Sequence, residues 1–168
     1  MSAREPGKVR RAGLRVFKAL PPGLSHRLVR AAKPTYALGA IALIEWDGKV
    51  LALRQSHRRG HSLPGGLVDR GEQPADAVRR EVLEETGLVI DPGDIVTVVF
   101  DPRIRHADVI FRVICDAEPQ VRPAGEAFAH HWLDLSGWTD GDRATARILR
   151  AVRAAHATPQ PGRLLSGG

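Results

Sequence analysis

The chain has 168 residues, 43% of them hydrophobic and 26% charged, a length that suits one domain whose core needs no disulfide bonds. Its one cysteine, Cys115, cannot form an internal disulfide, and no apolar run approaches the ~18 residues of a membrane-spanning helix. These features argue against disulfide-rich and helical membrane classes; because the basic N-terminus also lacks the apolar stretch of a secretory signal, we expect a soluble, cytoplasmic protein.

The positive charge is concentrated at the N-terminus. Residues 1–33 contain nine Lys or Arg and one acid and so carry +8, which leaves −2 for residues 34–168 because the net charge is +6. Apolar residues recur at helical period in 7–20 and 24–32 around a Pro-Pro-Gly break, so we expect a basic amphipathic helical extension over residues 1–34. We expect its apolar side chains to pack on the domain or on a homodimer partner; nucleic-acid or membrane contact through residues 1–33 is the alternative.

A β-hairpin is predicted after this extension. Residues 36–46 and 49–56 are apolar, strand-like runs separated by an Asp-Gly pair, which is a strong hairpin signal. A loop is expected at 57–64, leading to two glycines, and a short strand at 67–69. The two glycines are therefore expected to lie in a turn ahead of this short strand.

A helix is predicted after the glycines. It should begin near Pro74 or Ala75, because proline is tolerated in the first turn, and it should end at Gly87. Ala75, Val78 and Val82 recur at helical spacing and are expected to face the core.

The C-terminal half is predicted to add further strands and one more helix. Strands are predicted at 94–100, 107–117 and 128–135, a helix at 142–157, and a flexible Pro/Gly-rich tail at 158–168. Cys115 would then be buried in the second of these strands. Strands interspersed with helices, without regular βα alternation, predict a mixed-sheet α/β or α+β sandwich over residues 35–157.

Three glutamates share one face of the first of these helices. Glu81, Glu84 and Glu85 are spaced at i, i+3 and i+4, where like charges repel each other. Such a cluster is either a solvated surface or a site for a cation, and clustered carboxylate oxygens are the ligands that Mg²⁺ prefers. Taken alone, the three acids are more typical of a solvated surface.

The flanking residues favour the cation site. From Gly66 to Leu88 the sequence fits G-x5-E-x7-R-E-U-x-E-E-x-G-U, in which U is a bulky aliphatic residue and the first acid is Glu72. This segment resembles the Nudix box, and every specified position matches. The resemblance implies a Nudix-type α/β/α sandwich with a mixed β-sheet from about residue 36 to 157.

The resemblance also implies an activity. It implies Mg²⁺- or Mn²⁺-dependent hydrolysis of the pyrophosphate linkage in a nucleoside diphosphate joined to another moiety, such as a nucleotide, nucleotide sugar or dinucleotide. Glu81, Glu84 and Glu85 would be the catalytic carboxylates that bind the metal. The main-chain carbonyl of Gly65 would add a ligand, because a residue without a side chain allows close approach of the backbone.

Two further charged residues acquire roles by the same resemblance. Arg80 is expected to orient the glutamates through a charge-assisted pair, and Glu72 to organise the loop–helix junction, paired with Arg80 or reaching the metal through water. The motif does not identify the general base, which is either a glutamate of the motif or an acid of a later loop. Glu126, before the last strand, is our candidate for the base or for an additional ligand; an ordinary loop acid is the alternative.

The substrate is less well determined than the reaction. Arginine suits phosphate through its bidentate geometry, although an exposed loop arginine is often only solvated. The candidates for substrate binding are Arg54, Arg58, Arg59 and Arg103, with His61 and Arg105 in the same two segments. Neither the motif expected of ADP-ribose-cleaving relatives nor that of coenzyme A-cleaving relatives is visible.

Two other functions are compatible with a Nudix fold. An isopentenyl diphosphate isomerase would need a catalytic cysteine, for which only Cys115 is available. A catalytically quiet module could bind a ligand, or RNA through the basic arm, but such modules usually lose glutamates of the motif, and none is lost here.

Overall fold

The computed structural model describes residues 21, 33 and 35–157, and the account below concerns these residues alone. The predicted flexible tail over 158–168 therefore lies outside the described residues, and so does the predicted helical extension over 1–34 except for residues 21 and 33. The chain divides into two units between Thr35 and Tyr36, and the second unit carries the fold described here. In this part of the chain, no helix is long and apolar enough to cross a membrane.

The predicted hairpin is present. Strands β1 (Ala37–Trp46) and β2 (Lys49–Gln55) are antiparallel, with Glu45 opposite Val50. The intervening Asp47 and Gly48 have φ angles of 48° and 71°, the left-handed conformation that an Asp-Gly pair adopts readily in a tight hairpin turn.

Strand β1 is the centre of a mixed seven-stranded sheet within the described residues. One edge of β1 pairs in parallel with β6 (His106–Ile114) from Ala37 to Glu45. Its other edge pairs with β4 (Gly65–Leu67) near its start and with β2 near its end. The remaining strands are β5 (Ile95–Asp101), beside β6, and β3 (His61–Ser62) and β7 (Ala127–Leu133), both beside β2.

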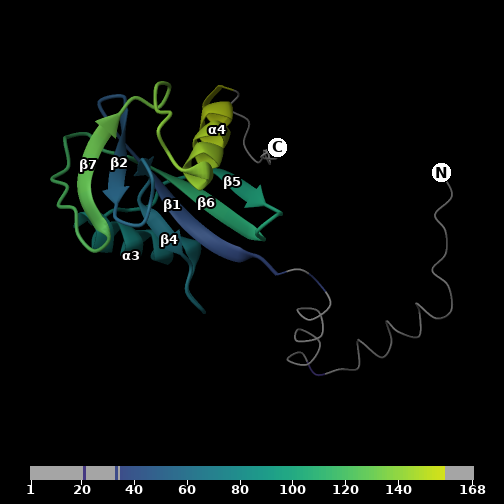
Figure 1. The fold of residues 1–168 in the computed structure, drawn as a ribbon. Helices are drawn as coiled ribbons and strands as arrows, with labels where there is room; N and C mark the ends of the chain where they lie inside the picture. Colours follow the sequence, from purple (N-terminus) through teal and green to yellow (C-terminus); the bar gives the residue numbers. More distant parts are fainter. Residues whose placement is uncertain (1–20, 22–32, 34, 158–168) are drawn as a thin grey trace. The chain divides into compact units, whose positions relative to one another are not determined.

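Helices α3 (Pro74–Thr86) and α4 (Arg143–Ala157) cover opposite faces of the sheet, as Figure 1 shows. Helix α3 begins at the predicted proline and ends at Gly87, whose φ of 70° and N–H bond to the Leu83 carbonyl, at 2.9 Å, complete its last turn.

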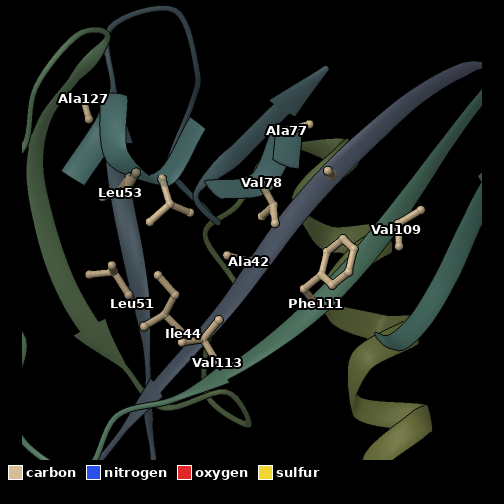
Figure 2. Packing of buried hydrophobic residues seen from close by; sticks show 12 residues of the cluster. Ala42, Ile44, Leu51, Leu53, Ala77, Val78, Val109, Phe111, Val113 and Ala127 are labelled. Carbon is tan, nitrogen blue, oxygen red and sulfur yellow. The ribbon is translucent and has the colours of Figure 1, made fainter. Parts of the chain in front are cut away.

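Both faces of the sheet are buried because β1 and β2 alternate apolar side chains between them. In β1, Ala42 and Ile44 pack in the cluster between the sheet and α3, which Figure 2 shows. Ile41 and Leu43 pack in the cluster between the sheet and α4. The predicted α/β/α sandwich with a mixed sheet is therefore confirmed. On α3, Val78 and Val82 are buried as predicted, Ala75 is partly buried, and Ala77 is an additional core residue.

Two sequence-based assignments were wrong. The short strand expected at 67–69 lies at Gly65–Leu67, because Gly65 and Gly66 pair with Ile41 and Ala40 of β1 instead of forming a free turn. The strand expected over 107–117 ends three residues earlier, at Ile114, so that Cys115 lies just after it. Cys115 is only half-buried, and this burial raises the pKa of its thiol.

Truncation of neighbouring residues on α3 tests which face of the helix stabilises the fold. Val82 is fully buried and Leu83 is exposed. We expect Val82→Ala to lower the free energy of unfolding by about 2 kcal/mol, since it removes two buried methyl groups and leaves a cavity. Leu83→Ala should change it by less than about 0.5 kcal/mol. Urea unfolding monitored by circular dichroism measures both, and equal losses would contradict the orientation of α3.

Candidate functional site

Glu85 is a buried carboxylate at the junction of α3 with β2 and β4. Glu85 is only 7% exposed, and an acidic residue is rarely so deeply buried without a partner. The backbone N–H of Gly65 donates to Oε2 at 2.9 Å, and Nε2 of Gln55 donates to Oε1. Burial raises the pKa of Glu85 to about 7, and the negative charges of Glu81 and Glu126 act in the same direction.

Glu81 lies directly against the glycine pair. A Cβ placed on Gly66 would be 2.5 Å from the Glu81 carboxyl carbon, so the missing side chain leaves the space that this carboxylate occupies. Gly65 has a φ of 134°, and a Cβ there would collide with the Ala40 carbonyl oxygen. Both glycines are therefore needed for the close approach of β4 to α3 and β1.

Arg80 bridges the acids of the motif. Its Nε and one terminal nitrogen donate to the two oxygens of Glu72, both at 3.1 Å, in a bidentate pair. Its other terminal nitrogen donates to Glu81 at 2.8 Å and lies 3.5 Å from Glu84. These bonds hold the pKa of Glu72 below its ordinary value. The structure thus contains the expected pair of Glu72 and Arg80, and Glu72 also accepts from the N–H of Asp69.

The three glutamates of the cluster differ in their surroundings. The side chain of Glu84 is 59% exposed and that of Glu81 is 18% exposed. Among the described residues, no group of three or more His, Cys, Asp or Glu side chains is already arranged around a metal position. Arg80 contacts two of the three carboxylates, those of Glu81 and Glu84.

The candidate base Glu126 lies in the same neighbourhood. Its charge contributes to the raised pKa of Glu85, although its own side chain is 69% exposed. Nδ1 of His57 is 2.9 Å from its carboxylate, and the N–H of Ser56 donates to its main-chain carbonyl at 3.1 Å. The turn after β2 therefore carries the loop that presents Glu126.

Among the arginines predicted to bind phosphate, Arg58 is the one whose charge acts on the pKa of Glu85. Its positive charge acts to lower the pKa of Glu85, while one terminal nitrogen lies 3.2 Å from Asp142 at the start of α4. Arg58 also lines a cavity of about 180 Å³ between the sheet and α4. Apolar walls of this cavity come from Ile41 and Leu63, and its polar groups include those of His106, Asp108 and Arg147.

The other basic candidates have different positions. Arg54 is half-buried in β2, whereas Arg59 and Arg103 are exposed. Ile104, in the turn that contains Arg103, and His106, at the start of β6, contribute to the cavity wall. His61 is engaged elsewhere: its Nδ1 lies 2.6 Å from Asp140, and its Nε2 lies 3.0 Å from Nδ1 of His131.

Sequence analysis missed three residues that contact the acids directly or indirectly. Gln55 binds Glu85, Ser62 donates to Gln55 at 2.8 Å, and His57 pairs with Glu126. A signal for Gln55 exists, since it follows Leu51 and Leu53 at the two-residue period that faces α3. His57 and Ser62 lie in or beside a loop, and the local pattern does not reveal their partners.

The donor set at this site fits a hard divalent cation. Glu81, Glu84 and Glu85 would supply oxygen ligands, and the carbonyl of Gly65 lies on β4, which Glu81 and Glu85 contact. Burial and repulsion leave Glu85 with a raised pKa, so a cation would relieve an electrostatic cost that the protein alone does not remove.

Substitution of Gly66 tests the close approach of Glu81. Gly66→Ala should displace the Glu81 carboxylate and weaken Mn²⁺ binding at least about 10-fold, as loss of ligand orientation commonly does. Gly48→Ala is the matched control: Gly48 also lacks a side chain, but it has open space around it and a φ of 71°.

The control should lose about 1 kcal/mol of stability and keep its Mn²⁺ affinity. Electron paramagnetic resonance of free Mn²⁺ measures binding. Unchanged affinity in Gly66→Ala would exclude Glu81 as a ligand held at this position.

Glu85 gives the metal-free protein a specific pH dependence. Its pKa rises from 4.5 to about 7 on folding, so the folded state keeps a proton that the unfolded state has already lost. The Glu85 contribution to the free energy of unfolding therefore falls as pH increases across this window and is constant above it.

Urea unfolding in EDTA, at several pH values between about 4 and 8, measures how the Glu85 contribution to the free energy of unfolding depends on pH. Glu85→Gln should remove it, and the control Glu84→Gln should retain it because Glu84 is largely exposed. An identical pH profile for wild type and Glu85→Gln would contradict the raised pKa.

Comparison with known proteins identifies relatives over much of the described unit. A MutT-like protein of Streptomyces ambofaciens is 32% identical over 92 residues, covering 54% of this chain and 58% of that protein. An ADP-ribose pyrophosphatase of Methanocaldococcus jannaschii is 41% identical over 56 residues, covering 32% of this chain and 33% of that protein. The chain thus spans about a third to just over half the length of these two curated relatives.

Solved structures share the same architecture. A MutT protein from Methanosarcina mazei Go1 has a TM-score of 0.62 at 27% identity, covering 74% of this chain and 96% of its own. A MutT NUDIX hydrolase from Burkholderia pseudomallei has a TM-score of 0.57 at 26% identity, covering 71% and 99%. The sequence profile of the NUDIX domain matches residues 33–152. The chain therefore belongs to the Nudix family.

Proposed function

We propose that this protein hydrolyses the pyrophosphate linkage of a nucleoside diphosphate joined to another moiety, with Mg²⁺ or Mn²⁺ as cofactor. The observation that carries the proposal is the placement of Glu85 and Glu81 against the glycines of β4. Glu85 accepts from the Gly65 N–H, and the Glu81 carboxylate fills the space beside Gly66. Family membership and similarity to a named ADP-ribose pyrophosphatase support the same chemistry.

The acids of the motif would hold the cation. Glu81, Glu84 and Glu85 are the proposed ligands, together with the carbonyl of Gly65. When bound, Mg²⁺ or Mn²⁺ supplies positive charge that neutralises a diphosphate and makes water more acidic. Arg80 keeps Glu81 and Glu84 in one group and prevents their mutual repulsion from spreading them apart.

Glu126 is the proposed general base or an additional ligand. Its carboxylate is largely exposed and can therefore accept a proton from water, while His57 holds it in one orientation at 2.9 Å. The hydrogen bond from the Ser56 N–H to the main-chain carbonyl of Glu126 holds the backbone of this residue. These contacts support the assignment of Glu126 as the proton acceptor.

Arg58 and the neighbouring cavity are the proposed binding groups for the remainder of the substrate. The Arg58 guanidinium is 3.2 Å from Asp142, its charge acts on Glu85, and it lines the cavity between the sheet and α4. Arg58 is the proposed phosphate contact, and the cavity lined by Ile41 and Leu63, on the α4 side of the sheet, is the proposed site for the attached moiety. Arg54, Arg59 and Arg103 remain proposed phosphate contacts at the periphery.

The position of Cys115 does not support the isomerase alternative. Its N–H donates to the Glu45 carbonyl at 2.8 Å, near the end of β1, whereas Gly65 pairs with Ile41 near the start. Four residues of extended strand separate these points, or roughly 13 Å. A catalytic cysteine is expected beside the acids.

A substrate panel tests the proposed activity. ADP-ribose, NADH, dinucleoside polyphosphates, nucleoside triphosphates, capped RNA and an isoprenoid diphosphate should be incubated with Mg²⁺ or Mn²⁺, and the phosphate-containing products identified. We expect cleavage of at least one nucleoside diphosphate derivative, and a rate at background for Glu85→Gln because its amide cannot replace the anionic ligand. No cleavage by folded wild type that binds Mn²⁺ would reject hydrolysis of these substrates.

The same assay examines Glu126. Glu126→Gln should reduce turnover by about 10²–10⁴-fold if this carboxylate is the base, because the amide cannot accept the proton. Glu118→Gln, in the preceding segment, is a control acid outside the site and should keep the wild-type rate. Near-normal turnover of Glu126→Gln would assign the base to another group.

A further inference from the structure

We propose that Gln55 is a positioning residue for Glu85, and that Ser62 fixes the Gln55 amide so that its NH₂ group faces the carboxylate. The inference deepens the proposed function and rests on it, because it concerns Glu85 as a ligand of the divalent cation. Gln55 and Ser62 lie outside the Nudix motif that runs from Gly66 to Leu88.

The hydrogen bonds define the direction of the Gln55 amide. Oε1 of Gln55 accepts from the Ser62 hydroxyl at 2.8 Å, and Nε2 donates to Oε1 of Glu85. Reversal of the amide would put its oxygen against an anionic oxygen of Glu85, which is unfavourable in a buried place. All three residues are buried, so water does not readily substitute for these bonds.

The Glu85 carboxylate is fixed from two strands. Gln55, at the end of β2, binds one oxygen, and the N–H of Gly65, in β4, binds the other at 2.9 Å. Since Glu85 itself belongs to α3, three elements determine the plane of its carboxylate. Each oxygen keeps a lone pair beyond the one used by its donor.

The two groups that donate to the Glu85 carboxylate are neutral, which distinguishes Glu85 from the other two glutamates of the cluster. Glu81 and Glu84 lie next to the Arg80 guanidinium, at 2.8 and 3.5 Å. In the described part of the chain, the Glu85 carboxylate accepts hydrogen bonds only from the Gln55 amide and the Gly65 N–H, and the nearby Arg58 is bonded to Asp142. Gln55 therefore orients this carboxylate without neutralising it, which leaves its charge for a cation.

Direct Mn²⁺ binding tests the proposal without any substrate. Metal-free wild type, Gln55→Met and Ser62→Ala should be titrated with Mn²⁺ and the free ion measured by electron paramagnetic resonance. Methionine keeps the length of the side chain but cannot donate, so we expect binding at least about 10-fold weaker, with a smaller loss for Ser62→Ala. Thr97→Val is the control, because it removes a different buried polar group, in β5.

A double-mutant cycle separates positioning from a general structural role. If Gln55 acts through Glu85, Gln55→Met should weaken Mn²⁺ binding in wild type and have no further effect on the residual binding of Glu85→Gln, measured at millimolar Mn²⁺. An equal loss in both backgrounds, or no loss in either, would overturn the proposal. Circular dichroism confirms that each variant is folded at the temperature of the titration.

The outcomes also distinguish this proposal from the proposed function. Wild type that binds Mn²⁺ and cleaves a nucleotide, with Gln55→Met binding Mn²⁺ equally well, overturns the role of Gln55 alone. Wild type that binds no Mn²⁺ overturns both the cation site and the role of Gln55. Wild type that binds Mn²⁺ in a Gln55-dependent manner, without cleaving the panel, supports the positioning role and rejects the proposed hydrolysis.

Discussion

The burial of Glu85 between a helix and two strands is the constraint on which the site depends. Packing of Val78 and Val82 fixes α3 on the sheet, and this placement removes the Glu85 carboxylate from water. Hydrogen bonds from Gln55 and Gly65 compensate part of the desolvation but provide no positive charge. The raised pKa of Glu85 reflects the part of this desolvation that the two hydrogen bonds do not compensate.

Strand pairing places the backbone where this carboxylate requires it. Because β2 pairs with β1 only at Glu45 and Trp46, the earlier part of that edge is available to β4, and Gly65 and Gly66 lie opposite Ile41 and Ala40. Strand β4 thus both pairs with β1 in the sheet and contacts α3 through Gly65 and Glu85. The second helical layer contributes separately, since Asp142 at the start of α4 holds Arg58 beside the cavity.

Features with a local cause were predictable from the sequence. The hairpin at Asp47-Gly48 and the end of α3 at Gly87 depend on neighbouring residues, and so does the grouping of the glutamates on one helical face. Contacts between distant segments were not predictable: Gln55 reaches Glu85 across 30 positions, and Arg58 reaches Asp142 across 84. Side-chain exposure also depends on packing, which is why three adjacent acids have different surroundings.

The bridge made by Arg80 has a consequence for the timing of cation capture. Because one guanidinium already links Glu72, Glu81 and Glu84, α3 can complete its turns during folding although its acids repel one another. An arriving ion would then meet a preorganised helix and would lose little affinity to the conformational entropy of ordering a chain segment. It would instead compete with Arg80 for the oxygens of Glu81 and Glu84 that the guanidinium contacts.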